Sequence, residues 1–231
     1  MSKIIIHGGF FSESSTNIET KIAKQQALLR IVKDSYAYLQ NHSALETVVY
    51  AVSQLEDDEL FNAGIGSQIQ SDGKIRMSAS LMDGESQKMS GVINIEEVKN
   101  PIQVAQVLMQ VDDRILGGSG ATNFARKHGF ESFSTEIPQR RAEYEAKLAS
   151  LGTGTVGCVA LDKNGKIAVA TSTGGKGFEI PGRISDSATV AGNYANEFCG
   201  VSLTGVGEDI VSNATAAKIV TRVTDGFSIE K

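Results

Sequence analysis

The chain has 231 residues, of which 41% are hydrophobic and 21% charged, and its formal net charge is −5. This length and balance are typical of a single globular domain with a sizeable core. The acidic balance argues against nucleic acid and anionic membranes as partners, because non-specific binding of both depends on clustered Lys and Arg. No apolar stretch approaches the length that spans a membrane.

The first residues predict a strand and no secretory signal, because the apolar run at residues 4–6 is short and ends in His7-Gly8-Gly9. We interpret His7 as structural. Two cysteines, Cys158 and Cys199, are too few for a disulfide framework or a metal site, and we expect both to be buried thiols in strands. The expected location is the cytoplasm.

Most of the chain alternates between helix-like and strand-like patterns. Apolar residues near helical spacing predict helices over residues 17–41, 44–55 and 209–226. Proline at the first turn predicts a helix over residues 101–111, and an exposed charged pair, Glu143 and Lys147, supports one over residues 137–151. Strands are expected over residues 76–83, 91–95 and 201–203. The consecutive acids at residues 56–59 predict a solvated loop, because four neighbouring carboxylates cannot all face one metal ion.

A glycine-rich segment at residues 115–120, Ile-Leu-Gly-Gly-Ser-Gly, precedes a predicted helix and suggests a nucleotide-binding loop. It has neither the third spaced glycine of a dinucleotide fingerprint nor the Gly-Lys-Ser/Thr of a P-loop. We therefore do not expect phosphate binding there.

The centre of the chain predicts a β-hairpin. Residues 155–161 and 167–173 are apolar runs of strand length, and Asp162-Lys163-Asn164-Gly165 between them is a turn signal. Thr155 opens the first strand and Thr173 closes the second, so their hydroxyls should lie close together.

Thr155 could become a nucleophile if something takes its proton. Cutting the peptide bond before it would free an α-amine on the same residue, with a pKa of about 7.7–8.0, which suits a general base near neutral pH. The preceding Gly152-Thr153-Gly154 is the kind of glycine-bearing segment that can be cut without disrupting a core.

Several motifs resemble one known family. Gly154-Thr155-Val156-Gly157, together with Ala-Thr-Ser-Thr-Gly-Gly at residues 170–175, resembles the isoaspartyl peptidase and plant-type L-asparaginase family of self-processing N-terminal-nucleophile hydrolases. Further matches are Leu-Phe-Asn-Ala-Gly-Ile-Gly at 60–66, Met-Asp-Gly at 82–84, Gly-Arg-Ile-Ser-Asp at 182–186 and Thr-Gly-Val-Gly-Glu at 204–208.

This resemblance covers most of residues 4–226 and implies an α+β fold, a four-layer αββα sandwich in a single domain 1–231. Relatives continue for several more elements, so we expect the C-terminal part of the sandwich to be shortened here. A further helix is expected to open at Ser228.

The resemblance also implies self-cleavage between Gly154 and Thr155, giving an alpha subunit 1–154 and a beta subunit 155–231. Thr155 would be the nucleophile, Thr173 would position its hydroxyl, and Thr204 and Gly205 would form the oxyanion hole.

Substrate recognition is expected from the loops around this centre. Arg183 would bind the α-carboxylate of the substrate through its planar guanidinium, and Asp186 would bind the α-amine. The remaining residues expected to line the pocket are Asn62, Gly175 and Gly207.

No catalytic cofactor is expected, but relatives hold a structural sodium ion through backbone carbonyls, which suit a hard cation. The corresponding residues in this chain are Leu55, Glu56, Asp58, Phe61, Ala63 and Ile65.

The implied reaction is hydrolysis of β-aspartyl dipeptides and L-asparagine with release of aspartate. Two alternatives remain open at this point: an N4-glycosylasparaginase with the same machinery, and an inactive, uncleaved homologue. A third, a nucleotide-binding module, would use residues 117–120. The expected partners are small-molecule substrates, with neither nucleic acid nor membrane, and the expected assembly is a dimer of alpha/beta heterodimers.

Overall fold

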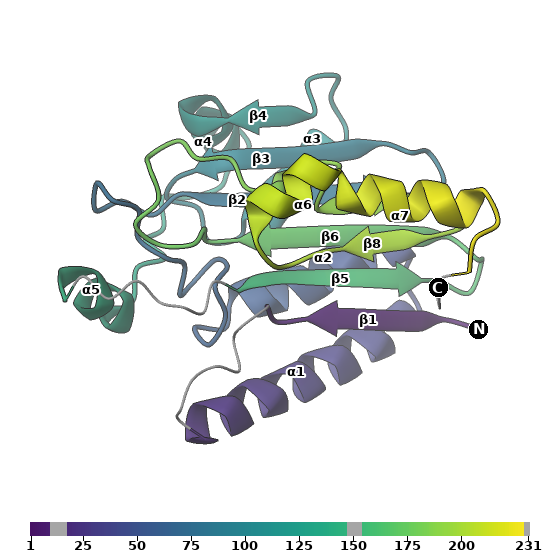
Figure 1. Ribbon diagram of the computed structural model, residues 1–231, viewed down its shortest axis with the longest axis horizontal. Helices are drawn as coiled ribbons and strands as arrows, with labels where there is room; N and C mark the ends of the chain where they lie inside the picture. Colours follow the sequence, from purple (N-terminus) through teal and green to yellow (C-terminus); the bar gives the residue numbers. More distant parts are fainter. Residues whose placement is uncertain (10–17, 147–153, 229–231) are drawn as a thin grey trace.

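A computed structural model describes residues 1–9, 18–146 and 154–228 (Figure 1). The helices are α1 (Ile18–Leu39), α2 (Ala44–Glu56), α3 (Pro101–Leu108), α4 (Gly118–Lys127), α5 (Pro138–Glu145), α6 (Gly207–Asn213) and α7 (Thr215–Thr224), with a short 3₁₀ turn η1 (Asp186–Ala188). The strands are β1 (Lys3–His7), β2 (Met77–Asp83), β3 (Met89–Ile95), β4 (Ile115–Gly117), β5 (Thr155–Leu161), β6 (Ile167–Thr173), β7 (Asn193–Ala195) and β8 (Gly200–Ser202).

Six strands form the main sheet, in the order β1-β5-β6-β2-β3-β4 (Figure 1). Only the β3–β4 pair is parallel within this sheet. The predicted hairpin is confirmed: β5 and β6 are antiparallel neighbours, and Leu161 pairs with Ile167 beside the turn. The same register places Thr155 opposite Thr173 at the far end of the hairpin.

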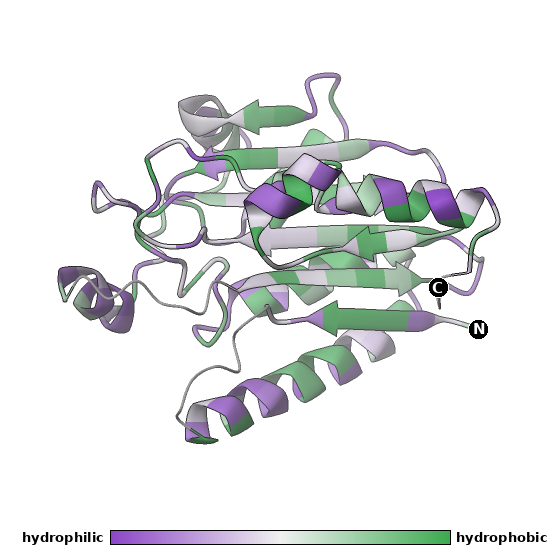
Figure 2. Cartoon of the chain, in the orientation of Figure 1, coloured by the Kyte–Doolittle hydropathy of each residue, from purple (hydrophilic) through white to green (hydrophobic). Residues whose placement is uncertain are grey.

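Helices cover one face of this sheet. α2 packs on β5 and β6, α3 packs on β2 and β3, and α1 packs on α2 and β1. Because side chains alternate along a strand, every second residue of the sheet points to the helices. Leu81 of β2 and Val156 of β5 are examples, and both are fully buried. In Figure 2 the apolar residues gather along these strands, whereas α5 is hydrophilic.

Local sequence signals explain where the covering helices begin. Ser43 caps α2: its hydroxyl accepts from the Glu46 N–H, and the Glu46 carboxylate accepts from the Ser43 N–H, which completes a capping box. α3 begins with Pro101, whose missing N–H costs nothing in the first turn. In α1 the buried residues Ala27, Ile31, Ser35 and Leu39 recur every four positions and form one face.

The opposite face of the main sheet is covered by a second, two-stranded sheet of β7 and β8. This small sheet packs on β2, β5 and β6, and α7 packs on its outer side. Helices therefore lie outside a pair of stacked sheets, with mixed α and β content as expected. The expected four-layer sandwich requires a larger second sheet than the two strands among the described residues.

The expectation of one helix over residues 209–226 is wrong. α6 ends at Asn213, and Ala214 adopts a left-handed conformation (φ 47°, ψ 46°) before α7 begins. Neither glycine nor proline marks this break, so the sequence pattern hides it. α3 and α5 are also shorter than predicted. The last residues of the predicted helix 137–151 lie outside the described residues, as do Thr153 and residues 229–231.

The acid run at residues 56–59 is only partly solvated, which corrects the sequence-based expectation. Glu56 is fully buried at the end of α2, where its Oε1 accepts hydrogen bonds from Ser172 Oγ (2.6 Å) and the Ile102 N–H (3.1 Å). Burial raises the pKa of Glu56 to about 8, so its carboxyl is neutral at pH 7. It joins α2, α3 and β6.

The two cysteines differ from each other. Cys158 is buried in β5 as expected, and burial raises its pKa. Cys199 lies in the connection between β7 and β8 and is only partly buried. The expectation that it is a buried thiol in a strand is therefore wrong. Within the described ranges, no helix is long and apolar enough to cross a membrane.

Replacing Leu81 by Ala should lower the free energy of unfolding by about 2–5 kcal/mol, because it leaves a cavity between the sheet and its helices. Ile5→Ala is the matched control: Ile5 is 72% exposed on β1, and its loss should cost less than about 1 kcal/mol. Urea denaturation would measure both, in a Thr155→Ala background that keeps every sample as one chain. Equal losses would contradict this assignment of the core.

Candidate active site

The two threonines of the hairpin meet as predicted. Thr155 Oγ1 donates a hydrogen bond to Thr173 Oγ1 at 3.1 Å, and both residues are buried. Thr173 Oγ1 also accepts from the Gly175 N–H at 3.2 Å. The strand register brings the pair together, and the backbone of residue 175 fixes the orientation of the second hydroxyl.

Gly154, which precedes Thr155, lies against the turn that follows β1. Gly9 has φ +113°, and a Cβ placed on it would lie 2.4 Å from the Cα of Gly154. Only glycine permits this approach of two backbones. The Gly8-Gly9 turn therefore contacts the expected cleavage site directly, which the sequence pattern does not indicate.

Asn62 joins the loop after α2 to the end of β6. Its Nδ2 donates to the Gly175 carbonyl at 2.5 Å, and its Oδ1 accepts from the Gln68 N–H at 3.0 Å. Its own carbonyl accepts from the Gly174 N–H at 2.9 Å. Asn62 and Gly175, both expected to bind substrate, are thus brought together beside Thr173.

The loop expected to hold sodium closes on itself. The Ile65 N–H donates to the Glu56 carbonyl at 2.7 Å, and the Phe61 N–H donates to the Asp58 carbonyl at 3.1 Å. A Cβ on Gly64 (φ +53°) would lie 2.3 Å from that Glu56 oxygen, so glycine is required for the closure. The Glu56 and Asp58 carbonyls thus each accept a hydrogen bond within the loop and keep a second lone pair, and sodium binding stays a prediction.

Arg183, Asp186 and Gly207 form a second cluster. A Cβ on Gly207 would lie 2.9 Å from Arg183 Nη2 and 2.9 Å from Asp186 Oδ1, so both side chains face the beginning of α6. Glu208, which the sequence analysis did not single out, accepts from Arg183 Nε at 2.7 Å. The Arg183 guanidinium lowers the pKa of Glu208 to about 2, so the pair is charged at neutral pH.

Asp186 is a buried carboxylate with spare hydrogen-bonding capacity. It is 3% exposed, and its Oδ2 has no hydrogen-bond partner among the described residues. Desolvation raises the pKa of Asp186 to about 6, while the nearby Arg183 opposes this effect. An unpaired buried carboxylate oxygen is suited to an ammonium group.

Thr204 and Gly205 lie between β8 and α6. Since β8 packs on β5 and β6, these two residues follow a strand that crosses the Thr155 hairpin. The role of these two residues in an oxyanion hole stays a prediction.

A partly buried polar cluster links β8 to the hairpin. His7 Nε2 lies 2.9 Å from Ser202 Oγ, Ser202 Oγ lies 2.7 Å from Thr171 Oγ1, and Thr171 Oγ1 donates to Asn193 Oδ1 at 2.9 Å. These residues belong to β1, β8, β6 and β7. Burial lowers the pKa of His7 to about 4, so the imidazole is neutral at pH 7.

This cluster lies against Gly157, two residues along β5 from Thr155. A Cβ on Gly157 would lie 1.9 Å from Ser202 Oγ and 2.5 Å from His7 Nε2, so this position of β5 must be glycine. The sequence analysis missed Ser202 and Thr171, because only the packing of the second sheet brings them together.

A buried threonine pair at the end of neighbouring strands, beside a charged pair suited to a zwitterion, is typical of hydrolases with a threonine nucleophile. Comparison with known proteins agrees. A family model described as asparaginase matches residues 1–150 and 134–231.

An isoaspartyl peptidase/L-asparaginase of Synechocystis sp. is 48% identical over 98% of this chain and 74% of its own length. Its counterpart in Nostoc sp. is 46% identical over 99% of this chain and 78% of its own length. An isoaspartyl peptidase of Escherichia coli is 36% identical over 94% of this chain and 75% of its own length. The chain belongs to the asparaginase family that these proteins represent, which confirms the resemblance drawn from its motifs.

The buried Asp186 predicts a pH dependence of stability. Because its pKa is about 6 in the folded state and 3.8 in the unfolded state, the folded protein binds more protons between these values. This contribution to stability is present below pH 4 and is lost as the pH rises to 6, by up to about 3 kcal/mol. Asp186→Asn removes it, so the variant should gain stability relative to the wild type as the pH rises from 4 to 7.

Thermal melts of both proteins at half-unit pH intervals would measure this difference. Asp225→Asn, an exposed change beyond α7, is the control. A constant difference between the wild type and Asp186→Asn across this range would contradict the raised pKa.

Proposed function

We propose that the chain is a self-processing threonine hydrolase that cleaves β-aspartyl dipeptides and L-asparagine and releases L-aspartate. The carrying observation is the hydrogen bond between the Thr155 and Thr173 hydroxyls next to Gly154. Relatives named isoaspartyl peptidase/L-asparaginase support the substrate class.

The first step is self-cleavage. The Thr155 hydroxyl oxygen attacks the Gly154 carbonyl carbon, the C–N bond breaks, and the acyl group moves from nitrogen to oxygen. Water then hydrolyses this ester, which leaves a Gly154 carboxylate and a Thr155 with a free α-amine. The close contact between Gly9 and Gly154 supports the step, since it fixes the peptide that must be attacked.

The freed amine then serves as general base for the hydroxyl of the same residue. Thr155 Oγ1 attacks the side-chain carbonyl of the substrate, and Thr173 Oγ1 holds the attacking oxygen. Thr204 and the Gly205 N–H would stabilise the oxyanion, after which ammonia or an amino acid leaves and water releases aspartate. These two residues directly follow β8, so the polar cluster that links β8 to the hairpin would help to position them.

The substrate's zwitterionic head would be bound by the second cluster. Arg183 has its Nε occupied by Glu208, which leaves its terminal nitrogens for the α-carboxylate. The unpartnered Asp186 Oδ2 would accept from the α-ammonium. The remaining lining of the substrate pocket would come from Asn62, Gly175 and Gly207.

The remaining expectations follow from the family and are proposals as well. The carbonyls of Leu55, Glu56, Asp58, Phe61, Ala63 and Ile65 would hold a sodium ion, whose charge would stabilise the loop that presents Asn62. We also propose a cytoplasmic location, a dimer of alpha/beta heterodimers, and a four-layer αββα sandwich. The free thiols Cys158 and Cys199 support a reducing compartment.

Mass spectrometry tests the first step. The wild type should give two fragments, residues 1–154 and 155–231, whereas Thr155→Ala should stay one chain because it lacks the attacking oxygen. Thr221→Ala, an exposed threonine of α7, is the control and should be cleaved like the wild type. A wild type that hydrolyses β-aspartyl substrates with its 154–155 bond intact would contradict the mechanism.

Arg183→Lys tests the second cluster, because lysine cannot offer the planar fork that binds a carboxylate. Its KM for L-asparagine should rise on the order of 10- to 100-fold, as expected for a weakened charged hydrogen bond, while self-cleavage continues. Ammonia release at varied substrate would measure it, and Arg222→Lys on the exposed side of α7 is the matched control. An unchanged KM would exclude Arg183 from the substrate pocket. If the wild type turned over glycoasparagine faster than L-asparagine, the chain would instead be a glycosylasparaginase.

A further inference from the structure

Strand β3 contains a β-bulge that contacts the loop carrying Arg183. Met77 of β2 pairs with Ile95 and Ala79 pairs with Val92, so two residues of β3 face Ser78 alone. One of the two is Asn94, which has φ +53° and whose N–H donates to Ser78 Oγ at 3.1 Å. Asparagine tolerates this left-handed conformation better than most residues. A bulge redirects a side chain, and here it redirects the Asn94 amide.

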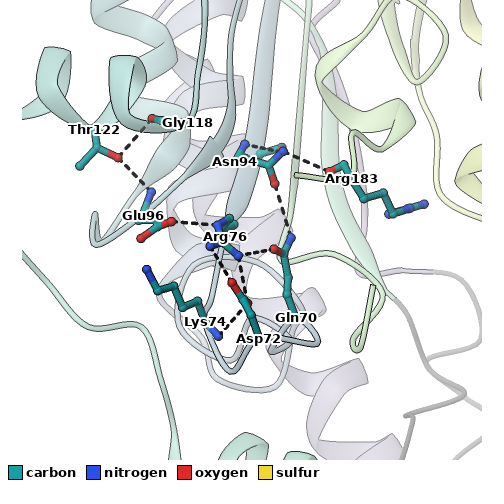
Figure 3. Close-up of polar contacts among 10 residues, drawn as sticks. Gln70, Asp72, Lys74, Arg76, Asn94, Glu96, Gly118, Thr122 and Arg183 are labelled. Atoms are coloured by element: carbon teal, nitrogen blue, oxygen red, sulfur yellow. Dashed lines mark hydrogen bonds and ion pairs between the residues drawn. The ribbon is translucent and has the colours of Figure 1, made fainter. Parts of the chain in front are cut away.

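The Asn94 amide contacts the backbone of the substrate loop. Its Nδ2 donates to the Arg183 carbonyl at 3.2 Å, and its Oδ1 accepts from Gln70 Nε2 at 3.4 Å (Figure 3). Asn94 is 8% exposed, so solvent competes little with these bonds. A side chain from the sheet thus holds the residue expected to bind the substrate carboxylate.

A chain of donors and acceptors determines the orientation of this amide. Arg76 can only donate, and its Nη1 donates to Gln70 Oε1 at 2.6 Å. Gln70 must therefore present its NH₂ group to Asn94, which in turn must accept with Oδ1 and offer Nδ2 to Arg183. Figure 3 shows Arg76, Gln70, Asn94 and the Arg183 backbone in this order.

The beginning of this chain is fixed by two carboxylates. Arg76 Nε donates to Glu96 at 2.8 Å, and Arg76 Nη2 donates to Asp72 at 2.9 Å. The side chain of Arg76 is only 13% exposed. Because these partners all accept hydrogen bonds from set directions, the Arg76 guanidinium has one orientation. Its hydrogen bond to Gln70 orients the Gln70 amide, which in turn orients the Asn94 amide.

The substrate loop has a matching contact beyond Asp186. Ser80 Oγ of β2 donates to the Ser187 carbonyl at 2.6 Å. The segment from Arg183 to Ser187 is therefore held at both ends by side chains of the main sheet. In between lie the guanidinium and the unpaired carboxylate of the second cluster.

We propose that Asn94 is a positioning residue for substrate binding: its amide, oriented by Gln70 and Arg76, holds the Arg183 backbone so that the guanidinium faces the substrate α-carboxylate. This inference rests on the proposed role of Arg183. It assigns Asn94 no contact with the reacting atoms, so substrate affinity should depend on Asn94 and the chemical step should not.

Two variants test the proposal. Asn94→Gly keeps the left-handed backbone but removes the amide. Asn94→Asp keeps the acceptor for Gln70 and replaces the donor by an oxygen that faces the Arg183 carbonyl. In both, KM for L-asparagine and Ki for the product L-aspartate should rise together by about 3- to 10-fold, as expected for one lost hydrogen bond. The kcat and the rate of 154–155 cleavage should stay within about twofold of wild type.

Gln87→Gly is the matched control, because Gln87 is exposed and has the same φ of +53° in the β2–β3 turn. It should leave KM and Ki unchanged. The proposal is overturned if both Asn94 variants bind aspartate like the wild type, or if kcat falls at constant KM. If the wild type itself has no turnover, the proposed function fails, and calorimetric titration of L-aspartate into the wild type and Asn94→Asp still decides the role of Asn94.

Discussion

The active site depends on one pairing, the antiparallel register of β5 and β6, which places Thr155 opposite Thr173. A slip by one residue would turn the side chains of a strand to the other face of the sheet and separate the two hydroxyls. The register is held from the helix side by buried apolar residues such as Val156 and by the Glu56–Ser172 hydrogen bond. The core that stabilises the fold therefore also sets the geometry of the nucleophile.

The opposite face of the same hairpin carries both apolar and polar groups: Val169 packs with Met82 and Ala195 in a small apolar cluster, and hydrogen bonds next to it help to position the second sheet. The partly buried His7–Ser202–Thr171 hydrogen bonds add directional contacts that restrict where β8 can lie. Gly157 makes room for these groups. As β8 leads into Thr204 and Gly205, the cluster determines where those residues lie relative to Thr155.

The threonine pair and the Arg183–Asp186 cluster differ in charge. The threonine pair is neutral and buried, whereas Arg183 and Asp186 form a partly unpaired charged cluster beside it. Burying Asp186 without a partner for Oδ2 costs stability at neutral pH. A site that binds an ammonium group must accept this cost, since a carboxylate already paired within the protein would have to exchange partners.

Much of the fold could be predicted locally. Apolar periodicity was sufficient for α1, α2 and the hairpin, because each depends on neighbours in the sequence. The break at Ala214 was missed because no glycine or proline marks it, and the partial exposure of Cys199 was missed because the packing of β8 decides it. The motifs also predicted Thr155, Thr173, Asn62, Arg183 and Asp186 as site residues, and the structure brings Thr155 to Thr173 and Arg183 and Asp186 to one cluster.

The amino-acid sequence by itself determined the family, the hairpin and the identity of its nucleophile candidate, because these lie in short contiguous motifs. Only the tertiary structure decided which distant side chains support them: Gly9 against Gly154, Ser202 against His7, and Asn94 against the Arg183 backbone. The physical reason is that hydrogen bonds act over about 3 Å in space, whatever the separation along the chain. Residues from several strands can therefore form one site that no local pattern predicts.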